Sequence, residues 1–548
     1  MKIREHIPPT VVTAARLVRT RLTLAGLRDR PERAHREAAV AAIKALRAPA
    51  PSPAGPRVLM FSLRGGWPPH VAWDAVVAEG LTLRGARVHV FNCGGHMPIC
   101  EVNFRHADPR VACAECRLYP EVLDGALGLE TSWLATYLAD GDRREIDVAV
   151  TRLDPSQYAA WTFDDRPIGT MVRNSVLWFV RKSRVDLQDP GDVRVYRDFL
   201  VAGAQVARMA PRLLDAVRPE LVVELNGLFF AEQILNSFVP PGCRVATYEA
   251  GWRMNSLGFD WLSAAGFADV DEPWQRLADR PLTDEESATL DGWIGKRRGG
   301  DMQRDFYVRF DAPVDGAILG ALGLQPDVPT AVLYTNLVWD TAVFGRDIGF
   351  ATIADWLRQT VAWFRGRPDR QLVIRIHPAE DLRPSQETKE KLSDVVRELA
   401  LPPNVTLVPS AASVSSYALM DAASVVMVYT STAGLEAALS GKQVLVAARV
   451  YYARRGFTRE VDTAADLGPS LDQAFASPRL TAAQRDLARR FAYLLLFRFL
   501  RDVPVVKQRP HTHPLLDAAG VEALRPGRSA DFDLLLDSLL HGRPFVRQ

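Results

Sequence analysis

The chain has few cysteines, no long apolar run and almost no net charge. Five cysteines among 548 residues do not make the framework of a disulfide-rich secreted protein. The most apolar stretch, residues 491–497, is far shorter than the roughly 18 residues of a membrane span. A net charge of +2 disfavours a dedicated nucleic-acid binder, which is usually much more basic. The N-terminus lacks the apolar core of a signal peptide, so we expect a cytoplasmic protein.

Familiar nucleotide-binding motifs are also missing. No G-x-G-x-x-G follows an early strand, which disfavours a dinucleotide-binding fold. Gly434 and Gly441 have six residues between them, and Lys442 is followed by glutamine, so this is not a P-loop. Residues 140–142 have the D-x-D form of metal-dependent transferases, but so short a pattern often arises by chance. We therefore expect no metal requirement for catalysis.

Charge is uneven along the chain. Residues 1–50 contain eleven Lys or Arg and four Asp or Glu, with arginines interleaved among leucines and valines. Such a segment suits a basic helix lying on an anionic membrane surface, which would make the protein peripheral on the inner face of the cytoplasmic membrane. The alternative is a solvated helical extension. Residues 48–56, rich in Pro and Ala, have the composition of a linker.

Beyond the linker, short apolar segments alternate with helical patterns in two series. Strands are expected at 57–63, 87–92, 144–150, 220–226 and 243–249, and again at 330–336, 371–376, 404–409, 424–429 and 443–448. Helices are expected near 70–84, 193–217, 350–365, 385–399, 413–421 and 432–440. This alternation predicts an α/β protein with parallel sheets covered on both faces.

The pattern weakens and becomes polar between the two series, so we place a domain boundary there. The predicted parts are a basic extension with linker, an N-terminal Rossmann-like domain, an interdomain region, a C-terminal Rossmann-like domain, and C-terminal helices that pack back across the domains. Their bounds are 1–55, 56–265, 266–327, 328–480 and 481–548.

A lone histidine stands at the exit of one predicted strand. In "VIRIHPAED", residues 373–381, His377 follows the strand directly, and Arg375 precedes it by two residues. Ligands of open parallel sheets bind outside the carboxyl ends of the strands. A structural histidine is the common alternative, but this position favours a functional one.

A second candidate site follows the strand at 424–429. Thr430, Ser431 and Thr432 end that strand, and Gly434 lies in the helix that begins there. Hydroxyls and backbone N–H groups in such a turn can bind a phosphate, although a plain helix cap has the same sequence. Glu436, one turn further on, could reach a ribose hydroxyl or be a surface residue.

Together these segments resemble a known family, the bacterial capsule polysaccharide biosynthesis glycosyltransferases, which include capsule Kdo transferases. The resemblance is carried by residues 332–340, 373–380, 401–409, 428–447 and 451–458. The His-Pro and Ser/Thr motifs are also similar to those of bacterial sialyltransferases, which use CMP-sugars. The resemblance is looser over 57–260 and does not cover 1–50. It implies a GT-B fold, with two Rossmann-like domains facing across a cleft, the donor nucleotide on the second and the acceptor on the first.

The resemblance also implies roles for residues. His377 with Ser431 and Thr432 would contact the donor phosphate. Tyr451 and Arg455 lie where a basic loop could close on the donor, or simply form a surface loop.

The N-terminal domain should activate the acceptor hydroxyl. Three residues after predicted strands are candidates for this role, and Glu249 is favoured. They are His70, Glu249 and Asp260.

Four cysteines gather in one segment. Cys113 and Cys116 have the spacing of a metal knuckle, whereas Cys93 and Cys100 are further apart, with His96 and His106 nearby. A structural zinc and reduced thiols are both open.

The leading function is transfer of a sugar from a nucleotide-sugar, with CMP the best guess, to a polysaccharide or lipid-linked acceptor in surface or capsular polysaccharide biosynthesis. One alternative is a CDP-polyol phosphotransferase of the teichoic-acid type. Another is a non-catalytic sugar-binding protein derived from the same fold.

Overall fold

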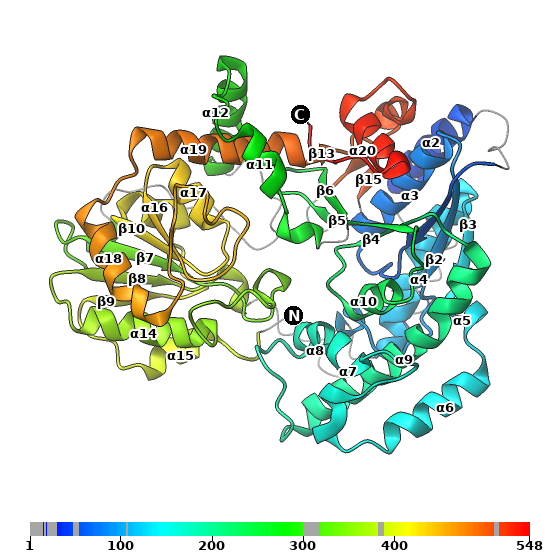
Figure 1. Ribbon diagram of the computed structural model, residues 1–548, viewed down its shortest axis with the longest axis horizontal. Coiled ribbons are helices and arrows are strands. Elements are labelled where there is room, and N and C mark those ends of the chain that lie inside the picture. Colours follow the sequence, from blue (N-terminus) through cyan, green and yellow to red (C-terminus); the bar gives the residue numbers. More distant parts are fainter. Residues whose placement is uncertain are drawn as a thin grey trace. The chain divides into compact units, whose positions relative to one another are not determined.

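The computed structural model describes residues 15, 18, 30–47, 54–105, 108–261, 264–299, 318–381, 388–508 and 514–547. The described chain forms two compact α/β units (Figure 1). Unit 1 comes from the stretches Met1–Val180, Val185–Gly266 and Leu500–Arg547, and unit 2 from Arg181–Arg184 and Phe267–Phe499. No helix among the described residues is long and apolar enough to cross a membrane.

Unit 1 is built on a seven-stranded sheet in the order β13-β6-β5-β4-β1-β2-β3. Its strands are β1 (Arg57–Phe61), β2 (Arg87–Asn92), β3 (Glu130–Trp133), β4 (Leu221–Leu225), β5 (Arg244–Ala250), β6 (Ser256–Trp261) and β13 (Arg501–Asp502). Strands β1 to β5 pair in parallel, β6 is antiparallel to β5, and β13 is antiparallel to β6. The carboxyl ends of these five parallel strands therefore lie at the same edge of the sheet.

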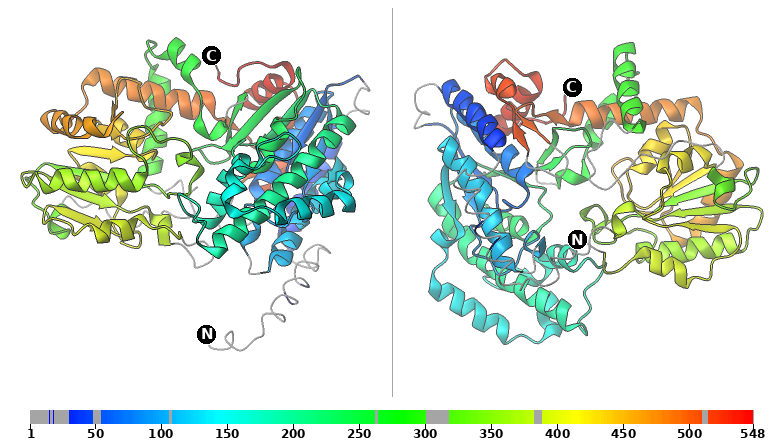
Figure 2. Two further views of the ribbon diagram at one scale, coloured as in Figure 1. Left: turned by 60° about the horizontal axis from the view of Figure 1, so that its bottom comes forward. Right: turned by 180° about the vertical axis from the view of Figure 1, so that it is seen from behind.

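Helices cover both faces of this sheet (Figure 2). One face is covered by α2 (Arg30–Leu46), α3 (Pro68–Thr82), α4 (Pro109–Leu127) and α20 (Ala530–His541). The other is covered by α5 (Leu134–Tyr137), α6 (Asp140–Thr151), α7 (Ile168–Met171), α8 (Arg173–Val180), α9 (Pro190–Val217) and α10 (Phe230–Asn236). A short hairpin of β14 (Val506–Lys507) and β15 (Leu515–Leu516) adds to the first face.

Unit 2 is built on a six-stranded sheet in which every pairing is parallel, in the order β12-β11-β10-β7-β8-β9. Its strands are β7 (Thr330–Tyr334), β8 (Gln371–Arg375), β9 (Val405–Val408), β10 (Val425–Val428), β11 (Gln443–Val446) and β12 (Arg459–Glu460). Strands β7, β8, β10 and β11 are fully buried, as expected for a sheet covered on both sides.

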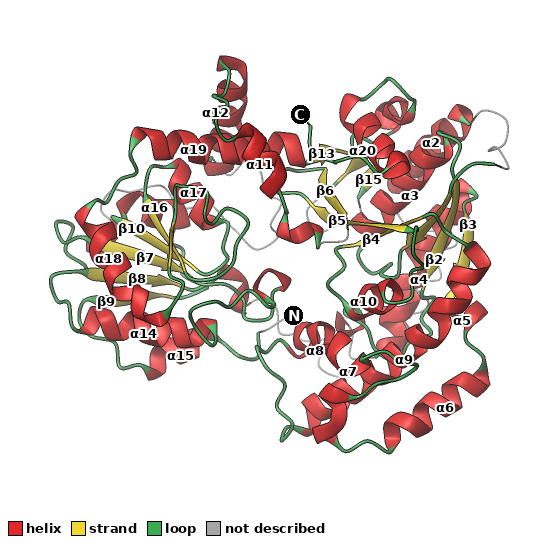
Figure 3. Cartoon of the chain, viewed as in Figure 1, coloured by secondary structure: helices red, strands yellow, loops and turns green. Residues whose placement is uncertain are grey.

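The helices of unit 2 also form two layers (Figure 3). One face packs on α14 (Ile353–Arg365), α15 (Leu392–Glu398) and α18 (Leu467–Ala476). On the other face lie α16 (Ser416–Ala422) and α17 (Ala433–Leu439), which contact α13 (Ile318–Ala321) and α19 (Ala482–Tyr493), respectively. Helix α12 (Asp284–Arg298) packs on α19, α11 (Asp271–Leu277) lies nearby, and α19 continues into a π-helix, Leu494–Phe499.

The predicted GT-B class, with two Rossmann-like units built on parallel sheets, is confirmed. The predicted strand at 144–150 is wrong, because these residues lie in helix α6. Ile146 and Val150 are buried four residues apart, which is the spacing of one helical face, and Val148 between them is half exposed. The third strand is instead the polar segment β3.

The predicted C-terminal segment 481–548 is divided between the units. Helix α19 and the π-helix belong to unit 2, whereas residues from Leu500 onward complete unit 1. Most of the basic segment predicted to bind membranes lies outside the described residues. Its described part, α2, buries Ala39 and Ile43 in the core of unit 1.

Candidate functional site

Arg375 and His377 follow one another on the same face at the carboxyl end of β8. They alternate with Ile374 and Ile376, whose side chains belong to the core on the opposite face. Strand β8 pairs with β7, which pairs with β10, so Thr430 after β10 reaches the same edge. We call Arg375, His377 and Thr430 the anion site.

The ring of His377 is fixed through its Nδ1 atom. The backbone N–H of Ala379 donates to Nδ1 at 3.1 Å, and the backbone N–H of His377 donates to Thr335 Oγ1 at 2.9 Å. Because Nδ1 accepts a hydrogen bond, the neutral ring carries its proton on Nε2. The geometry thus favours a hydrogen-bond donor at Nε2 over an imidazolium.

The two acids that follow His377 have structural roles. Glu380 is buried, and its carboxylate accepts the backbone N–H groups of Leu392 and Ser393 at 2.8 and 3.1 Å, which caps α15. Asp381 pairs with Lys391 at 2.9 Å. Glu380 and Asp381 therefore both join the segment after β8 to the start of α15.

Arg375 is a buried cation without a counter-charge in the described part of the chain. Its side chain donates from Nη1 to the Pro409 carbonyl, while Nε is buried with no hydrogen-bond acceptor among the described residues. No carboxylate of those residues pairs with it, the residue is only 5% exposed, and burial lowers its pKa. A buried, unneutralised guanidinium costs several kcal/mol, so an anion bound here would be strongly favoured.

Thr430 adds a hydroxyl to this edge. Its backbone N–H donates to Asn336 Oδ1 at 3.2 Å, whereas its buried Oγ1 has no partner among the described residues. Ser431 Oγ accepts the Ala433 N–H at 3.3 Å, but Thr432, the residue before α17, makes no side-chain cap. A plain helix cap therefore accounts for Ser431 and leaves Thr430 and Thr432 to other partners.

The start of α17 is packed against Tyr452. The Tyr452 hydroxyl donates to the Ser431 carbonyl, and a Cβ atom at Gly434 would lie 2.3 Å from that hydroxyl. Only glycine fits at position 434 for this reason. Burial raises the pKa of Tyr452, as does the nearby charge of Glu436.

The neighbouring loop residues have other contacts. The ring of Tyr451 stacks on Phe491 at 6.5 Å. Arg455 forms an ion pair with Asp271 and lies over the same Phe491 ring at 5.5 Å. Their predicted role in closing on a donor stays a prediction.

Glu436 is held by residues from two other helices. Arg297, in the last turn of α12, donates from Nε to Glu436 Oε1 at 3.3 Å, and both side chains are largely buried. Tyr417 of α16 lies beside both of them, and burial followed by the charge of Glu436 raises the pKa of its hydroxyl. Sequence reasoning missed Arg297 and Tyr417, because neither stands in a recognisable motif.

In unit 1, two of the predicted acceptor-side candidates, Glu249 and His70, lie on opposite faces of the sheet. Glu249, near the end of β5, accepts from Asn226 Nδ2 at 3.0 Å and from the Ala250 N–H at 2.8 Å. His70, in the first turn of α3, lies on the other face with its ring 5.8 Å from that of Tyr248. Asp260 of β6 lies opposite Thr247 of β5 in the antiparallel pairing of these strands.

Asp74 lies one helical turn after His70, a placement that the spacing H-x-x-x-D could have suggested. Its carboxyl accepts from Ser62 Oγ and lies beside the Tyr248 hydroxyl. Burial raises the pKa of Asp74 to about 6, although both hydroxyls act in the opposite direction. A carboxyl that titrates near neutrality at a sheet edge suits proton transfer.

A buried charge cluster stands beside this group. Arg64, in the loop after β1, forms an ion pair with Glu101 at 2.9 Å and a forked pair with Glu232. Glu224 lies close by, and its pKa is well above the usual range because of burial and the charge of Glu232. A Cβ atom on Gly65 would lie 1.9 Å from the Cys116 carbonyl, so the loop that carries Arg64 requires glycine.

Replacing Asp124 of α4 by asparagine is expected to remove a pH-dependent loss of stability. Burial raises the pKa of Asp124 from 3.8 to about 7, with Asp74 adding to the shift and the amide of Asn92 opposing it. The stability that comes from the raised pKa is complete below about pH 4 and is lost as the pH rises through about 7. Thermal melts should show Asp124→Asn more stable than wild type by about 1–3 kcal/mol at pH 8 and similar to it near pH 4.

The matched control is Asp140→Asn, an exposed residue of α6. It should leave the pH dependence unchanged. Equal shifts for Asp124→Asn at both pH values would contradict the assignment.

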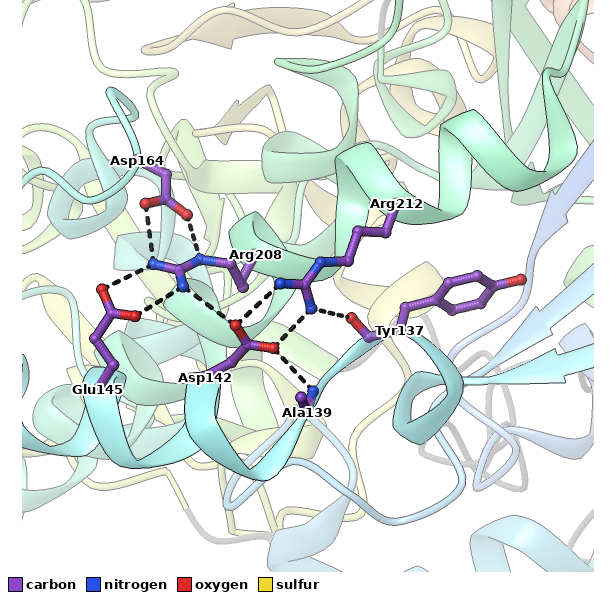
Figure 4. Close-up of polar contacts among 7 residues, drawn as sticks. All are labelled: Tyr137, Ala139, Asp142, Glu145, Asp164, Arg208 and Arg212. Carbon is purple, nitrogen blue, oxygen red and sulfur yellow. Dashed lines mark hydrogen bonds and ion pairs between the residues drawn. The ribbon is translucent and has the colours of Figure 1, made fainter.

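The D-x-D segment is part of an ion-pair network (Figure 4). Asp142 accepts from Arg212 at 2.6 and 3.0 Å and from Arg208 at 3.2 Å, and it also accepts the Ala139 N–H at 2.8 Å. The pKa of Asp142 is lowered, and the largest cause is the hydrogen bonding from Arg212. Asp142 therefore joins α6 to α9, which is a structural role.

The four clustered cysteines are free thiols, with Cys93 buried and Cys100, Cys113 and Cys116 half-buried. Cys116 Sγ accepts the Gly66 N–H at 3.1 Å. Among the residues that the structure describes, which do not include His106, no three His, Cys, Asp or Glu residues are arranged to hold a metal ion. The structural zinc stays a prediction.

The protein belongs to the α/β class and has two Rossmann-like units, with a buried cation, a histidine and a threonine at the carboxyl edge of the second sheet. Residues 339–491 match the family model described as capsule polysaccharide biosynthesis protein, so the resemblance to that family is confirmed over this segment. No curated protein matches the chain.

Several solved structures are similar at low identity. The β-Kdo 2,7 transferase of Thermosulfurimonas dismutans KpsC is 15% identical, over 58% of this chain and 88% of its own, with a TM-score of 0.34. The β-Kdo 2,4 transferase of the same protein is 13% identical, over 56% and 86%, with a TM-score of 0.32. Sucrose-phosphate synthase of Thermosynechococcus elongatus is 14% identical, over 81% and 95%, with a TM-score of 0.30. Scores this low do not by themselves assign a fold or an activity.

Proposed function

We propose that the protein is a glycosyltransferase of capsule polysaccharide biosynthesis. It would transfer a sugar from a nucleotide-sugar, with CMP as the nucleotide, to a hydroxyl of a glycan or lipid-linked acceptor. The observation that supports this most directly is the buried Arg375 guanidinium, which no described carboxylate neutralises. The phosphate of a nucleotide-sugar supplies the missing negative charge.

The donor phosphate would lie against the anion site. Arg375 would neutralise its charge, the Thr430 hydroxyl would donate to one oxygen, and His377 would donate from Nε2 to the oxygen that leaves with the nucleotide. As the bond from the anomeric carbon to that oxygen breaks, the nucleotide keeps the electron pair. Stabilising that charge lowers the barrier, because the charge is larger in the transition state than in the bound donor.

The acceptor would be activated in unit 1. Its hydroxyl oxygen forms the new bond to the anomeric carbon and loses its proton to a base. Glu249 and His70 remain the predicted groups, and we add Asp74, whose pKa of about 6 suits a base near neutral pH. A cytoplasmic protein, peripheral on an anionic membrane surface, would fit a lipid-linked acceptor.

A thermal-shift comparison of CMP, CDP, UDP and GDP tests the donor. CMP should raise the melting temperature, since a ligand that binds only the native state stabilises it by mass action. A shift with CDP alone would favour the polyol phosphotransferase alternative. The absence of any shift with all four nucleotides would contradict the proposal.

A further inference from the structure

The carboxylate of Glu436 accepts a hydrogen bond from Arg297, which lies outside the segment that matches the capsule family. Arg297 belongs to α12, which precedes residues 339–491 by more than one element. Arg297 Nε lies 3.3 Å from Glu436 Oε1, and the two side chains are 16% and 17% exposed. The Tyr417 hydroxyl lies beside the same pair.

This pairing gives the Glu436 carboxylate a cationic partner in a place where a lone carboxylate would be costly. A buried charge is tolerated when a partner offsets its loss of hydration. A carboxylate offers about four acceptor positions, so the donor from Arg297 leaves capacity for further hydroxyls. An ionised carboxylate can only accept, and two neighbouring sugar hydroxyls are suitable donors to it.

The position of Glu436 relates it to the anion site. Thr430 ends β10, and Glu436 lies in the first turns of α17, which follows that strand directly. The ribose of a nucleotide is bonded directly to its phosphate, so a nucleotide whose phosphate lies at Thr430 has its ribose next to this residue. The last turn of α12 is also fastened at Arg298, which donates to Ser440 at 2.9 Å and pairs with Asp421, so Arg297 is presented from a fixed helix end.

We propose that Arg297 is a positioning residue of the donor site, which holds the Glu436 carboxylate in the orientation that binds the ribose hydroxyls of the nucleotide. The inference rests on the proposed function, because it requires a nucleotide at the anion site. It assigns α12 to the donor site and makes the ribose, in addition to the phosphate, a determinant of recognition.

Calorimetry with CMP and with 2′,3′-dideoxy-CMP tests the proposal. Wild-type protein should bind CMP about tenfold more tightly than the dideoxy analogue, the value of one or two hydrogen bonds. Arg297→Ala should bind CMP about tenfold more weakly than wild type and bind the analogue unchanged. Arg297→Lys should recover part of the CMP affinity, since it restores the charge without the planar donor group.

Further variants test whether the effect is specific to the pairing of Arg297 with Glu436. Lys296→Ala removes one exposed positive charge from the same helical turn and should bind both ligands as wild type does. Glu436→Gln should show the same ribose-specific loss as Arg297→Ala, and the double variant should be no weaker than either single one, because the two residues act as a unit.

The outcomes separate the two proposals. Equal weakening of both ligands by Arg297→Ala, or no weakening of either, overturns the positioning role and leaves the proposed function standing. Failure of wild-type protein to bind CMP at all overturns the donor assignment, and the positioning role falls with it.

Discussion

Replacing His377 by alanine is expected to lower the maximal rate of sugar transfer about a hundredfold, with a much smaller change in donor affinity. The ring accepts the Ala379 N–H at Nδ1, so the proton that it can donate lies on Nε2. A hydrogen bond from Nε2 to the departing phosphate strengthens as charge develops there, and so acts mainly in the transition state. Steady-state kinetics, with kcat and KM measured separately, gives the result.

Two amide variants refine this prediction. The N–H group of glutamine can occupy a place near Nε2, whereas that of asparagine lies nearer to Nδ1. His377→Gln should therefore retain more activity than His377→Asn. His541→Ala, which changes an exposed histidine of α20, is the control and should leave both constants unchanged. If His377→Ala folds with a normal melting temperature and keeps nearly full turnover, the histidine is structural.

Replacing Arg375 by methionine is expected to have two effects of opposite sign. Without donor, the variant should be more stable than wild type by about 1–3 kcal/mol, because an apolar side chain of similar volume replaces a buried cation that no described carboxylate neutralises. With donor, it should bind CMP about a hundredfold more weakly, since a charged hydrogen bond to phosphate is lost. Thermal melts and calorimetry measure the two effects.

Arg370→Met is the matched control for Arg375→Met. Arg370 stands just before the same strand and is paired with Asp369 at 2.8 Å, so its loss should change neither quantity by much. CMP binding that survives in Arg375→Met would show that the phosphate does not lie against this guanidinium.

The sheet of unit 2 was predictable because of how its strands are buried. Both faces of β7, β8, β10 and β11 are covered, so each is a short run of apolar residues that stands out between helical patterns. The position of His377 followed from the same argument, since the end of a parallel strand is where ligands bind.

The errors in unit 1 arose where local sequence is ambiguous. Residues 144–150 contain β-branched side chains and read as a strand. However, Arg208 and Arg212 of α9 pair with Asp142 and Glu145 and so hold this segment as α6 against α9 (Figure 4). Strand β3 is a short, polar edge strand, so its four residues carry little of the alternation by which strands are recognised.

Partners distant in sequence decide much of the candidate site. The pairing of Arg297 with Glu436 spans 139 residues, and nothing local to either residue indicates it. Between Tyr451 and Tyr452, the sequence gives no reason to prefer one, yet the hydroxyl of Tyr452 is the group that packs on Gly434. That no carboxylate of the described residues pairs with Arg375 is likewise a property of the folded chain alone.

The composition of unit 1 has a consequence for synthesis on the ribosome. Strand β13 and helix α20 belong to its sheet and its core, and Phe532, Leu535 and Leu536 are fully buried there. All of unit 2 is therefore translated before the last pieces of unit 1 emerge. A nascent chain would carry an incomplete first unit, with apolar surface of α3 uncovered, throughout synthesis of the second, a state in which chaperone binding protects against aggregation. A premature stop anywhere before β13 would leave the earlier-made unit unfinished while the later-made one was whole.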